Sequence, residues 1–168
     1  MIHVCSLARL HTTIEQSGAR HVVTLLGIED EVILPATVPS SNHLRLQLHD
    51  ITGPMDGYVT PQIEHIERFL GFVRGWRREA PLVIHCYAGI SRSTAAAFTA
   101  VCALNPKRDE AIVAQALRRA SHTAFPNPRI VQLADQLLAR QGRMVAAVES
   151  IGRGTVAAEG EPFRLDLE

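Results

Sequence analysis

The sequence predicts an α/β protein with a central, mainly parallel sheet of about four to five strands flanked by helices. Short β-like runs alternate along the chain with longer segments in which apolar residues recur at helical spacing. The run Leu82–His85 is also too short for a helix, follows Pro81 and precedes a nearly all-apolar segment. We therefore expect a buried central strand followed by a buried helix.

The remaining strands are expected over residues 2–5, 21–26 and 44–49. The second is a continuous apolar run that ends at Gly27. The third alternates leucine with a polar residue, which is the period-two pattern of a strand with one polar face. Residues 29–43 contain two prolines and a Ser-Ser-Asn sequence, so they should form mostly loop with a short turn of helix.

The helices follow from apolar spacing and from residues that begin helices. We expect a weak helix within residues 7–17, and a helix that starts at Pro61 after a loop over 50–60. A third helix covers 91–104. Asp109 is the expected N-cap of a fourth, through about Ala120. The last prediction is one long helix from Pro128 through about Glu149.

The chain length of 168 residues suits a single domain. We assign residues 1–150 to this domain. Residues 151–168 form a Gly-rich, charged tail, which is expected to be poorly ordered or to add an edge strand.

Composition limits the classes of partner and cofactor. Lys plus Arg is 17 and Asp plus Glu is 17, so no bulk field attracts nucleic acid or anionic lipid. No segment approaches the roughly 18 apolar residues of a membrane span. The three cysteines form no paired framework, so we expect thiols in a cytoplasmic protein. The eight histidines lack metal-site spacing beside carboxylates, and neither a metal nor another cofactor is expected.

The informative segment joins the strand ending at His85 to the helix over 91–104. In it Arg92 follows Cys86 by six positions. A loop at the carboxyl end of a strand, over a helix N-terminus, turns backbone N–H groups inward and favours an anion. The Arg92 guanidinium can bind two phosphate oxygens. The sequence thus predicts a phosphate-binding loop of Tyr87, Ala88, Gly89, Ile90, Ser91 and Arg92.

The same surroundings favour the thiolate of Cys86, which is the nucleophilic form. Ser93 can donate a hydrogen bond to the sulfur and make it a better leaving group. The alternative is a buried free cysteine without a catalytic role. That alternative leaves Arg92 and the polar start of an apolar helix unexplained.

The pattern His85-Cys86, five residues, Arg92-Ser93 resembles the phosphate-binding loop of the protein tyrosine phosphatase superfamily. The sequence Ala-Gly-Ile-Ser-Arg-Ser is most similar to the dual-specificity branch, and we expect a bacterial member. The resemblance covers residues 44–139 well, 1–43 loosely and 140–168 not at all. It implies hydrolysis of phosphomonoesters through a cysteinyl-phosphate intermediate. Its implied substrate is a phosphorylated protein, foremost at phosphotyrosine and then at phosphoserine or phosphothreonine, or a small phosphomonoester.

The resemblance also implies a general acid in the loop after the third strand. Asp50 follows that strand directly but lies 36 residues before Cys86, whereas Asp56 lies 30 before it, nearer the usual spacing. We favour Asp50, because topology survives loop insertions better than spacing does. His85 is expected to orient the loop through backbone carbonyls. Asn127 either ties loops together near the site or simply starts a helix.

Two rival functions stay open at this point. One is a rhodanese-like sulfurtransferase, which also carries a cysteine between a strand and a helix. The other is a phosphate-binding module that recognises phosphorylated partners without turnover. Cys5 is a further candidate, as a resolving thiol for Cys86. The oligomeric state is not predicted.

Overall fold

A computed structural model describes residues 1–167 of the chain. The elements in chain order are β1 Ile2–Ser6, α1 Leu10–Ser17, β2 His21–Leu26, a 3₁₀ turn Ser40–Asn42, β3 His43–Gln47, α2 Ile63–Gly75, β4 Leu82–Cys86, α3 Arg92–Leu104, α4 Glu110–Ala120, α5 Pro128–Leu137, α6 Arg143–Ser150 and β5 Phe163–Leu165.

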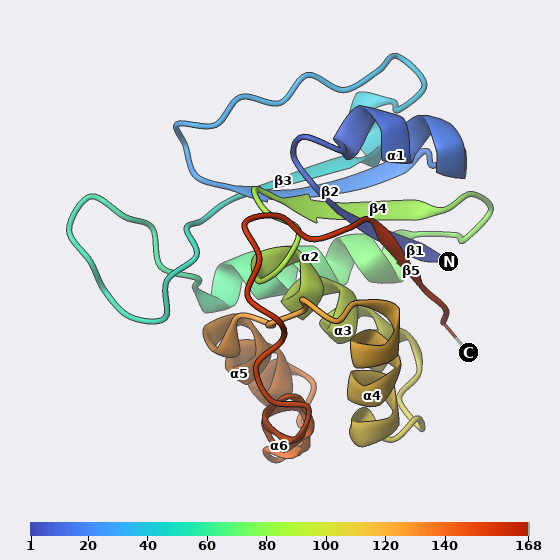
Figure 1. Ribbon diagram of the computed structural model, residues 1–168. Coiled ribbons are helices and arrows are strands. Elements are labelled where there is room, and N and C mark those ends of the chain that lie inside the picture. Colours follow the sequence, from blue (N-terminus) through green and yellow to red (C-terminus); the bar gives the residue numbers. More distant parts are fainter. Residues whose placement is uncertain (168) are drawn as a thin grey trace.

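The strands form one sheet in the order β3-β2-β4-β1-β5. All neighbouring pairs are parallel except β1 with β5, which is antiparallel. Helix α1 covers one face of the sheet, and helices α2 to α6 lie on the other (Figure 1). The predicted fold class is therefore confirmed, with five strands in the sheet.

Side chains alternate between the two faces of each strand and build two cores. The larger core contains Ile84 and Cys86 of β4 together with Phe98 of α3. The smaller one lies under α1 and contains Cys5 and Val83. Because β4 is buried along its whole length, the loop that follows it starts from a rigid base.

Most predicted boundaries agree with the structure to within a few residues. Asp109 caps α4 as expected, since its carboxylate accepts hydrogen bonds from the amides of Ala111 and Ile112. The start of α2 is two residues later than predicted. Gln62 is its N-cap, and the Gln62 amide donates to Nδ1 of His65 over 3.0 Å.

The single long helix predicted from Pro128 to Glu149 is wrong. It is divided into α5 and α6 by a turn in which Ala139, Gln141 and Gly142 have φ of 52°, 55° and 85°. The Asp135 carboxylate accepts hydrogen bonds from the amides of Gly142 at 2.7 Å and Met144 at 2.8 Å. These bonds satisfy free N–H groups at the start of α6 and stabilise the break.

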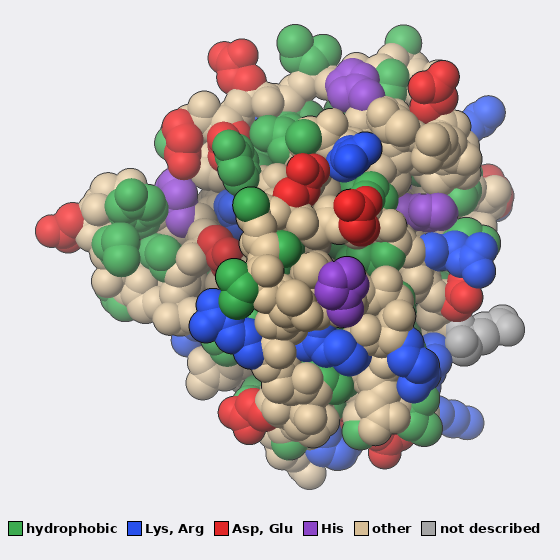
Figure 2. Space-filling view, in the orientation of Figure 1, with side chains coloured by type: hydrophobic (Ala, Val, Ile, Leu, Met, Phe, Trp, Pro, Cys, Tyr) green, Lys and Arg blue, Asp and Glu red, His purple; other side chains and the backbone are tan. Residues whose placement is uncertain are grey.

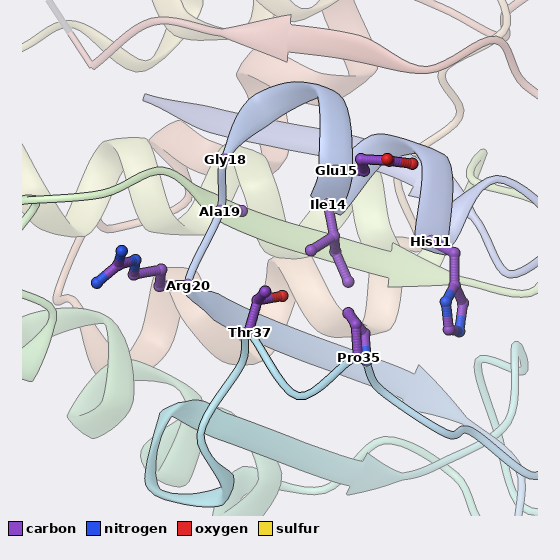
Figure 3. A pocket seen from close by; sticks show the side chains of 8 residues that line it. All are labelled: His11, Ile14, Glu15, Gly18, Ala19, Arg20, Pro35 and Thr37. Carbon is purple, nitrogen blue, oxygen red and sulfur yellow. The ribbon is translucent and has the colours of Figure 1, made fainter.

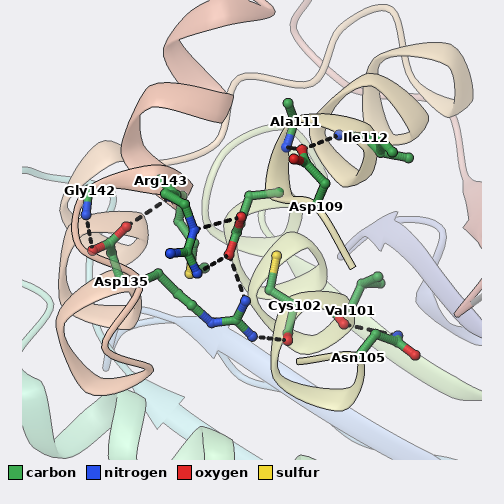
Figure 4. Close-up of polar contacts among 12 residues, drawn as sticks. Val101, Cys102, Asn105, Asp109, Ala111, Ile112, Asp135, Gly142 and Arg143 are labelled. Atoms are coloured by element: carbon green, nitrogen blue, oxygen red, sulfur yellow. Dashed lines mark hydrogen bonds and ion pairs between the residues drawn. The ribbon is translucent and has the colours of Figure 1, made fainter. Parts of the chain in front are cut away.

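An ion-pair network fixes the same turn (Figure 4). Arg140 donates to the carboxylate of Glu110 over 2.6 Å and to the carbonyl of Cys102 over 2.8 Å. Arg143 adds a second contact to Glu110 at 3.1 Å. Arg140 thus points into the protein, toward α4 and α3.

After α6 the chain returns across the molecule to the sheet (Figure 1). Arg118 donates to the carbonyl of Gly152 over 2.9 Å, at the start of this return. Residues 163–165 then pair with β1 as the edge strand β5. Across residues 1–167 no helix combines the length and apolar character needed to cross a bilayer.

Candidate active site

The predicted phosphate-binding loop lies where β4 ends at Cys86 and α3 begins at Arg92. Its carbonyl groups are bound by the surrounding segments, through backbone hydrogen bonds from Leu7 N to Tyr87 O (3.1 Å), Gly160 N to Ala88 O (2.9 Å), Phe125 N to Ile90 O (2.9 Å) and Asn127 N to Ser91 O (3.2 Å). Because C=O and N–H point in opposite directions across a trans peptide, outward carbonyls turn the following amides toward the loop interior.

Gly89 allows this loop to sit close against the sheet. Its φ is +73°, and a Cβ here would lie 2.8 Å from the backbone of Cys5 and Ser6. A side chain at this position would collide with the end of β1. Glycine is therefore required both by the backbone conformation and by the close approach of two main chains.

Cys86 is 2% exposed, and its sulfur contacts two groups in the loop. Ser93 Oγ lies 3.1 Å from Sγ, and the amide of Gly89 donates to Sγ over 3.3 Å. The structure thus brings Cys86 and Ser93 together as the sequence predicted.

Arg92 is 8% exposed and is held at one end of its guanidinium group. Its NH1 donates over 3.0 Å to the carbonyl of Leu48, the residue directly after β3. Its Nε is buried without a hydrogen-bond partner among residues 1–167. A buried guanidinium donor without a partner is suited to an anionic ligand.

Asp50 faces the loop and is held by two neighbours. Its Oδ1 accepts a hydrogen bond from Ser91 Oγ at 2.7 Å and another from Asn127 Nδ2 at 2.8 Å. Asn127 uses its own Oδ1 to cap α5, accepting from the amide of Ile130 at 3.1 Å. Both alternatives considered for Asn127 are present, since it starts a helix and also ties a second loop to the site.

Asp50, Cys86 and Arg92 line one cavity of about 600 Å³. Tyr87, Ala88, Ile90 and Ser91 complete its loop side, and Thr52, Phe125, Asn127 and Pro128 close the opposite side. Asp56 lies in an exposed turn outside this lining, as far as the described residues show. Of the two candidate acids, only Asp50 lines the same cavity as Cys86.

His85 is completely buried and contacts β2. Its Nε2 lies 2.8 Å from Thr24 Oγ1, and the same hydroxyl lies 2.9 Å from Nε2 of His43. Nδ1 of His85 makes no well-formed hydrogen bond among residues 1–167, but the Cys86 backbone lies near enough to favour the protonated ring, so the bond expected between His85 and a carbonyl near Cys86 is present only as a weak contact. Burial lowers the pKa of His85 to about 3, so the ring is neutral at physiological pH.

Cys5 lies beside His85 in the register of β1 and β4 but faces the other side of the sheet from Cys86. Burial raises the pKa of its thiol to about 12. A disulfide with Cys86 would require the backbone to move, because the two side chains leave opposite faces. The structure gives no support to Cys5 as a resolving thiol.

A somewhat larger cavity lies elsewhere, between α1 and the loop over residues 33–37 (Figure 3). It measures about 680 Å³ and is bordered by His11, Glu15 and Arg20. Neither a cysteine nor a residue of the predicted loop belongs to its lining in the described chain. Volume alone would have pointed to the wrong site, so the assignment depends on the chemistry around Cys86.

Several residues at the site were missed by sequence reasoning. Leu48 binds Arg92 through its carbonyl, and Thr52 and Phe125 line the cavity. Thr24 contacts His85, and Gly160 donates to the loop carbonyl of Ala88. Leu48 and Gly160 act through the main chain, which leaves no side-chain signal in a sequence. Phe125 lies two residues before Asn127, a predicted site residue, and that proximity is the signal available in the sequence.

A cysteine, an arginine and an aspartate that line one cavity at the predicted phosphate-binding loop are the arrangement expected of a phosphatase. The chain belongs to the protein-tyrosine phosphatase family, whose model matches residues 30–138. A search of curated proteins gives no match.

Solved structures share the fold at low sequence identity. DUSP15 is 18% identical, with a TM-score of 0.63 over 89% of this chain and 90% of its own. Human DUSP28 is 17% identical, with a TM-score of 0.64 over 83% of this chain and 89% of its own. The human tyrosine phosphatase-like serine/threonine/tyrosine-interacting protein is 19% identical, with a TM-score of 0.62 over 83% and 92%. The resemblance to the superfamily is confirmed, and the likeness to the dual-specificity branch holds at the level of the fold.

Proposed function

We propose that this phosphatase hydrolyses phosphomonoesters, foremost phosphotyrosine in proteins and then phosphoserine or phosphothreonine, through a cysteinyl-phosphate intermediate on Cys86. The observation that carries the proposal is the position of the Cys86 sulfur. The sulfur accepts a hydrogen bond from the Gly89 amide over 3.3 Å, and Cys86 lines one cavity with Arg92 and Asp50. Neither rival, a sulfurtransferase or a binding module without turnover, is favoured by the family match.

Substrate binding uses the donors of the loop. The amides that follow the outward carbonyls face the phosphate, and Arg92 contributes its Nε and the second end of its guanidinium. The bond from Arg92 NH1 to Leu48 O holds this side chain in place before substrate arrives. Prepositioned donors stabilise the charge that spreads over the phosphoryl oxygens in the transition state.

In the first step the Cys86 thiolate attacks phosphorus in line with the leaving oxygen. The sulfur–phosphorus bond forms as the phosphorus–oxygen bond to the substrate breaks. Protonated Asp50 gives its proton to the departing oxygen. Ser91 Oγ and Asn127 Nδ2 both donate to Oδ1 of Asp50, which leaves Oδ2 as the oxygen that carries the proton.

In the second step a water molecule attacks the phosphorus of the intermediate. Asp50, now a carboxylate, accepts a proton from this water. The sulfur–phosphorus bond breaks and its electron pair returns to sulfur. Ser93, whose Oγ lies 3.1 Å from Sγ, donates a hydrogen bond to the departing sulfur. Phosphate leaves and the thiolate is regenerated.

The charges around the site support a singly phosphorylated protein side chain as the substrate. A second cavity of about 340 Å³ adjoins the first and shares Asp50, Tyr87 and Arg92 with it. Its lining adds the carboxylates of Glu29 and Asp30. Three carboxylates and one guanidinium disfavour a polyphosphorylated ligand, whose additional phosphates would face negative charge.

Figure 2 shows both signs of charge on the face of the molecule that is in view. Lys and Arg side chains form a band across its lower half, where Figure 1 has the helices. The sequence carries no net charge, with 17 basic and 17 acidic residues. Attraction of the phosphate therefore depends on the local donors of the loop.

The test is phosphate release from matched phosphotyrosine, phosphoserine, phosphothreonine and phosphoinositide substrates, with Cys86→Ser as the control. We expect the fastest release from phosphotyrosine peptides and none above background from the variant. Tight binding of phosphopeptide without turnover would establish a binding module. Persulfide formation on Cys86 from thiosulfate, without phosphatase activity, would establish a sulfurtransferase.

A further inference from the structure

The segment over residues 152–160, here termed the C-terminal strap, contacts the main chain of the phosphate-binding loop. Gly160 is the one buried residue between 155 and 162. Its amide donates to the carbonyl of Ala88 over 2.9 Å. The donor Gly160 lies outside residues 30–138, the part of the chain that the family model matches, whereas the acceptor Ala88 lies within it.

The Ala88 carbonyl belongs to the same peptide group as the Gly89 amide, which donates to Sγ of Cys86 over 3.3 Å. In a trans peptide these two dipoles point in opposite directions. A hydrogen bond that holds the carbonyl outward therefore holds the amide toward the sulfur. Gly160, the Ala88–Gly89 peptide and Cys86 form one line of two hydrogen bonds.

The contact between the strap and the loop is a contact of two main chains. A Cβ at Gly160 would lie 3.0 Å from the Gly89 carbonyl oxygen and 3.2 Å from Thr123 Oγ1. On its other side Gly89 already meets the backbone of Cys5 and Ser6. The Gly89 backbone is therefore enclosed between β1 and the strap.

Both ends of the strap are anchored near the site. Glu159 accepts a hydrogen bond from Ser6 Oγ and lies 3.9 Å from the guanidinium of Arg9. Further back, the amide of Thr155 donates to the carbonyl of His122 over 2.9 Å. A Cβ at Gly154 would be 2.7 Å from that same carbonyl oxygen, so the strap packs directly on the segment leading to Phe125.

We propose that the C-terminal strap orients the Ala88–Gly89 peptide and thereby stabilises the Cys86 thiolate, with Gly160 as a positioning residue. The inference rests on the proposed role of Cys86 as the nucleophile. Without the Gly160 hydrogen bond, the Ala88–Gly89 peptide can rotate, because glycine tolerates the new dihedral angles. Rotation would turn the Ala88 carbonyl toward the sulfur and disfavour its negative charge.

The experiment measures alkylation of Cys86 by iodoacetamide as a function of pH, in the full chain without substrate. Gly160→Pro removes the donor N–H, Gly160→Ala is the control that adds the same Cβ but keeps the N–H, and Val156→Pro is the control for proline at a position that is 80% exposed. Cys5 and Cys102 contribute little, because burial raises the pKa of both thiols to about 12. We expect Gly160→Pro to be alkylated about tenfold more slowly at pH 6, as befits one lost hydrogen bond to a charged group.

The rate maximum at high pH should be unchanged, so that the effect appears as a shift of the pH profile, which a general loss of packing would not produce. Equal profiles for Gly160→Pro, Val156→Pro and the parent protein would overturn the proposal. If Gly160→Pro does not fold, as judged by circular dichroism, Glu159→Ala takes its place, since it keeps the amide but removes the anchor. An unchanged profile in that variant overturns the proposal as well.

The alkylation profile needs no phosphorylated substrate. A shifted profile in a protein that fails to release phosphate would contradict the proposed function but support the proposal for the strap. An unshifted profile in an active phosphatase would do the reverse.

Discussion

The Asp50 carboxylate is positioned by side chains from two different segments of the chain. Ser91 of the loop and Asn127 at the start of α5 both donate to Oδ1. Asn127 is 2% exposed and is itself fixed by capping α5. The residue proposed as general acid is thus held by the helix that follows the site, although it lies on an exposed loop.

Replacing Asp50 by Asn should lower kcat toward a phosphotyrosine peptide by roughly 10²–10⁴, the usual range for a lost general acid and base. The loss should be smaller for p-nitrophenyl phosphate, whose leaving group needs less protonation. Asp56→Asn is the matched control and should retain near-normal kcat. A large loss in Asp56→Asn with little change in Asp50→Asn would reverse the assignment of the acid.

Replacing Ser93 by Ala should slow the second step, because the departing sulfur loses a hydrogen bond now seen at 3.1 Å. A hydrogen bond to a charged group contributes about 1.5–3 kcal/mol, so kcat should fall by about 10- to 100-fold. The intermediate should then accumulate, giving a burst of p-nitrophenol equal to the enzyme concentration. Unchanged kcat without a burst would remove Ser93 from the mechanism.

At the scale of elements, the break between α5 and α6 depends on buried charge. The side chains of Glu110 and Arg140 are 5% and 7% exposed, so each needs the other. Burial alone would raise the pKa of Glu110. Hydrogen bonds from Arg143, from its own backbone amide and from Arg140 outweigh burial and hold the pKa below its ordinary value.

Replacing Glu110 by Gln should lower the free energy of unfolding at pH 7 by about 3 kcal/mol, since Arg140 would be left buried without its counter-ion. Because the folded pKa of Glu110 is depressed, its contribution is present above the unfolded pKa of about 4.5 and is lost as pH falls through the folded pKa. The difference between the two proteins should therefore shrink in acid. Urea unfolding at several pH values measures it.

Glu149→Gln is the control for that comparison, because Glu149 is exposed at the end of α6. It should change the free energy of unfolding little at any pH. A difference between Glu110→Gln and the parent that stays constant into acid would show that the carboxylate charge is not what stabilises the turn.

At the scale of the whole molecule, charge is balanced overall but separated locally. Arg153 lies over the Phe125 ring, 5.3 Å from its centroid, on one wall of the site. Glu29 and Asp30 line the adjoining cavity on the other side of Asp50 and Tyr87. Hydrogen bonds from its own amide and from His49 lower the pKa of Glu29, so it is ionised at neutral pH. A peptide bound at Cys86 would meet these carboxylates beside its phosphorylated residue.

Phosphotyrosine peptides with Lys or Arg next to the phosphorylated residue should therefore be hydrolysed about two- to fivefold faster, in kcat/KM, than peptides with Glu there. The preference should fall when the assay contains about 0.5 M salt, because salt screens exposed charges. Glu29→Gln combined with Asp30→Asn should remove it. Glu31→Gln is the matched control on the same loop, and an equal preference in all three proteins would contradict the assignment.

Much of the fold could be predicted from local pattern. Leu82 to His85 had to be a buried strand, and Asp109 had to cap a helix, because period and capping chemistry act over a few residues. The prediction of one helix from Pro128 to Glu149 was wrong because the break between α5 and α6 depends on residues distant in the sequence. Apolar residues recur at helical spacing on both sides of Gly142, which is the one local sign of a break, and the break is stabilised by Glu110, which lies 33 residues before Arg143.

The sequence by itself determined the loop from Cys86 to Ser93 and the alternation of strands and helices, because both are encoded by residues adjacent in the chain. Only the tertiary structure decided that Asp50, and not Asp56, lines the cavity that contains Cys86. It alone placed Cys5 on the far face of the sheet and Gly160 behind the loop. These relations depend on which segments pack together and on main-chain hydrogen bonds, and neither leaves a local mark in the sequence.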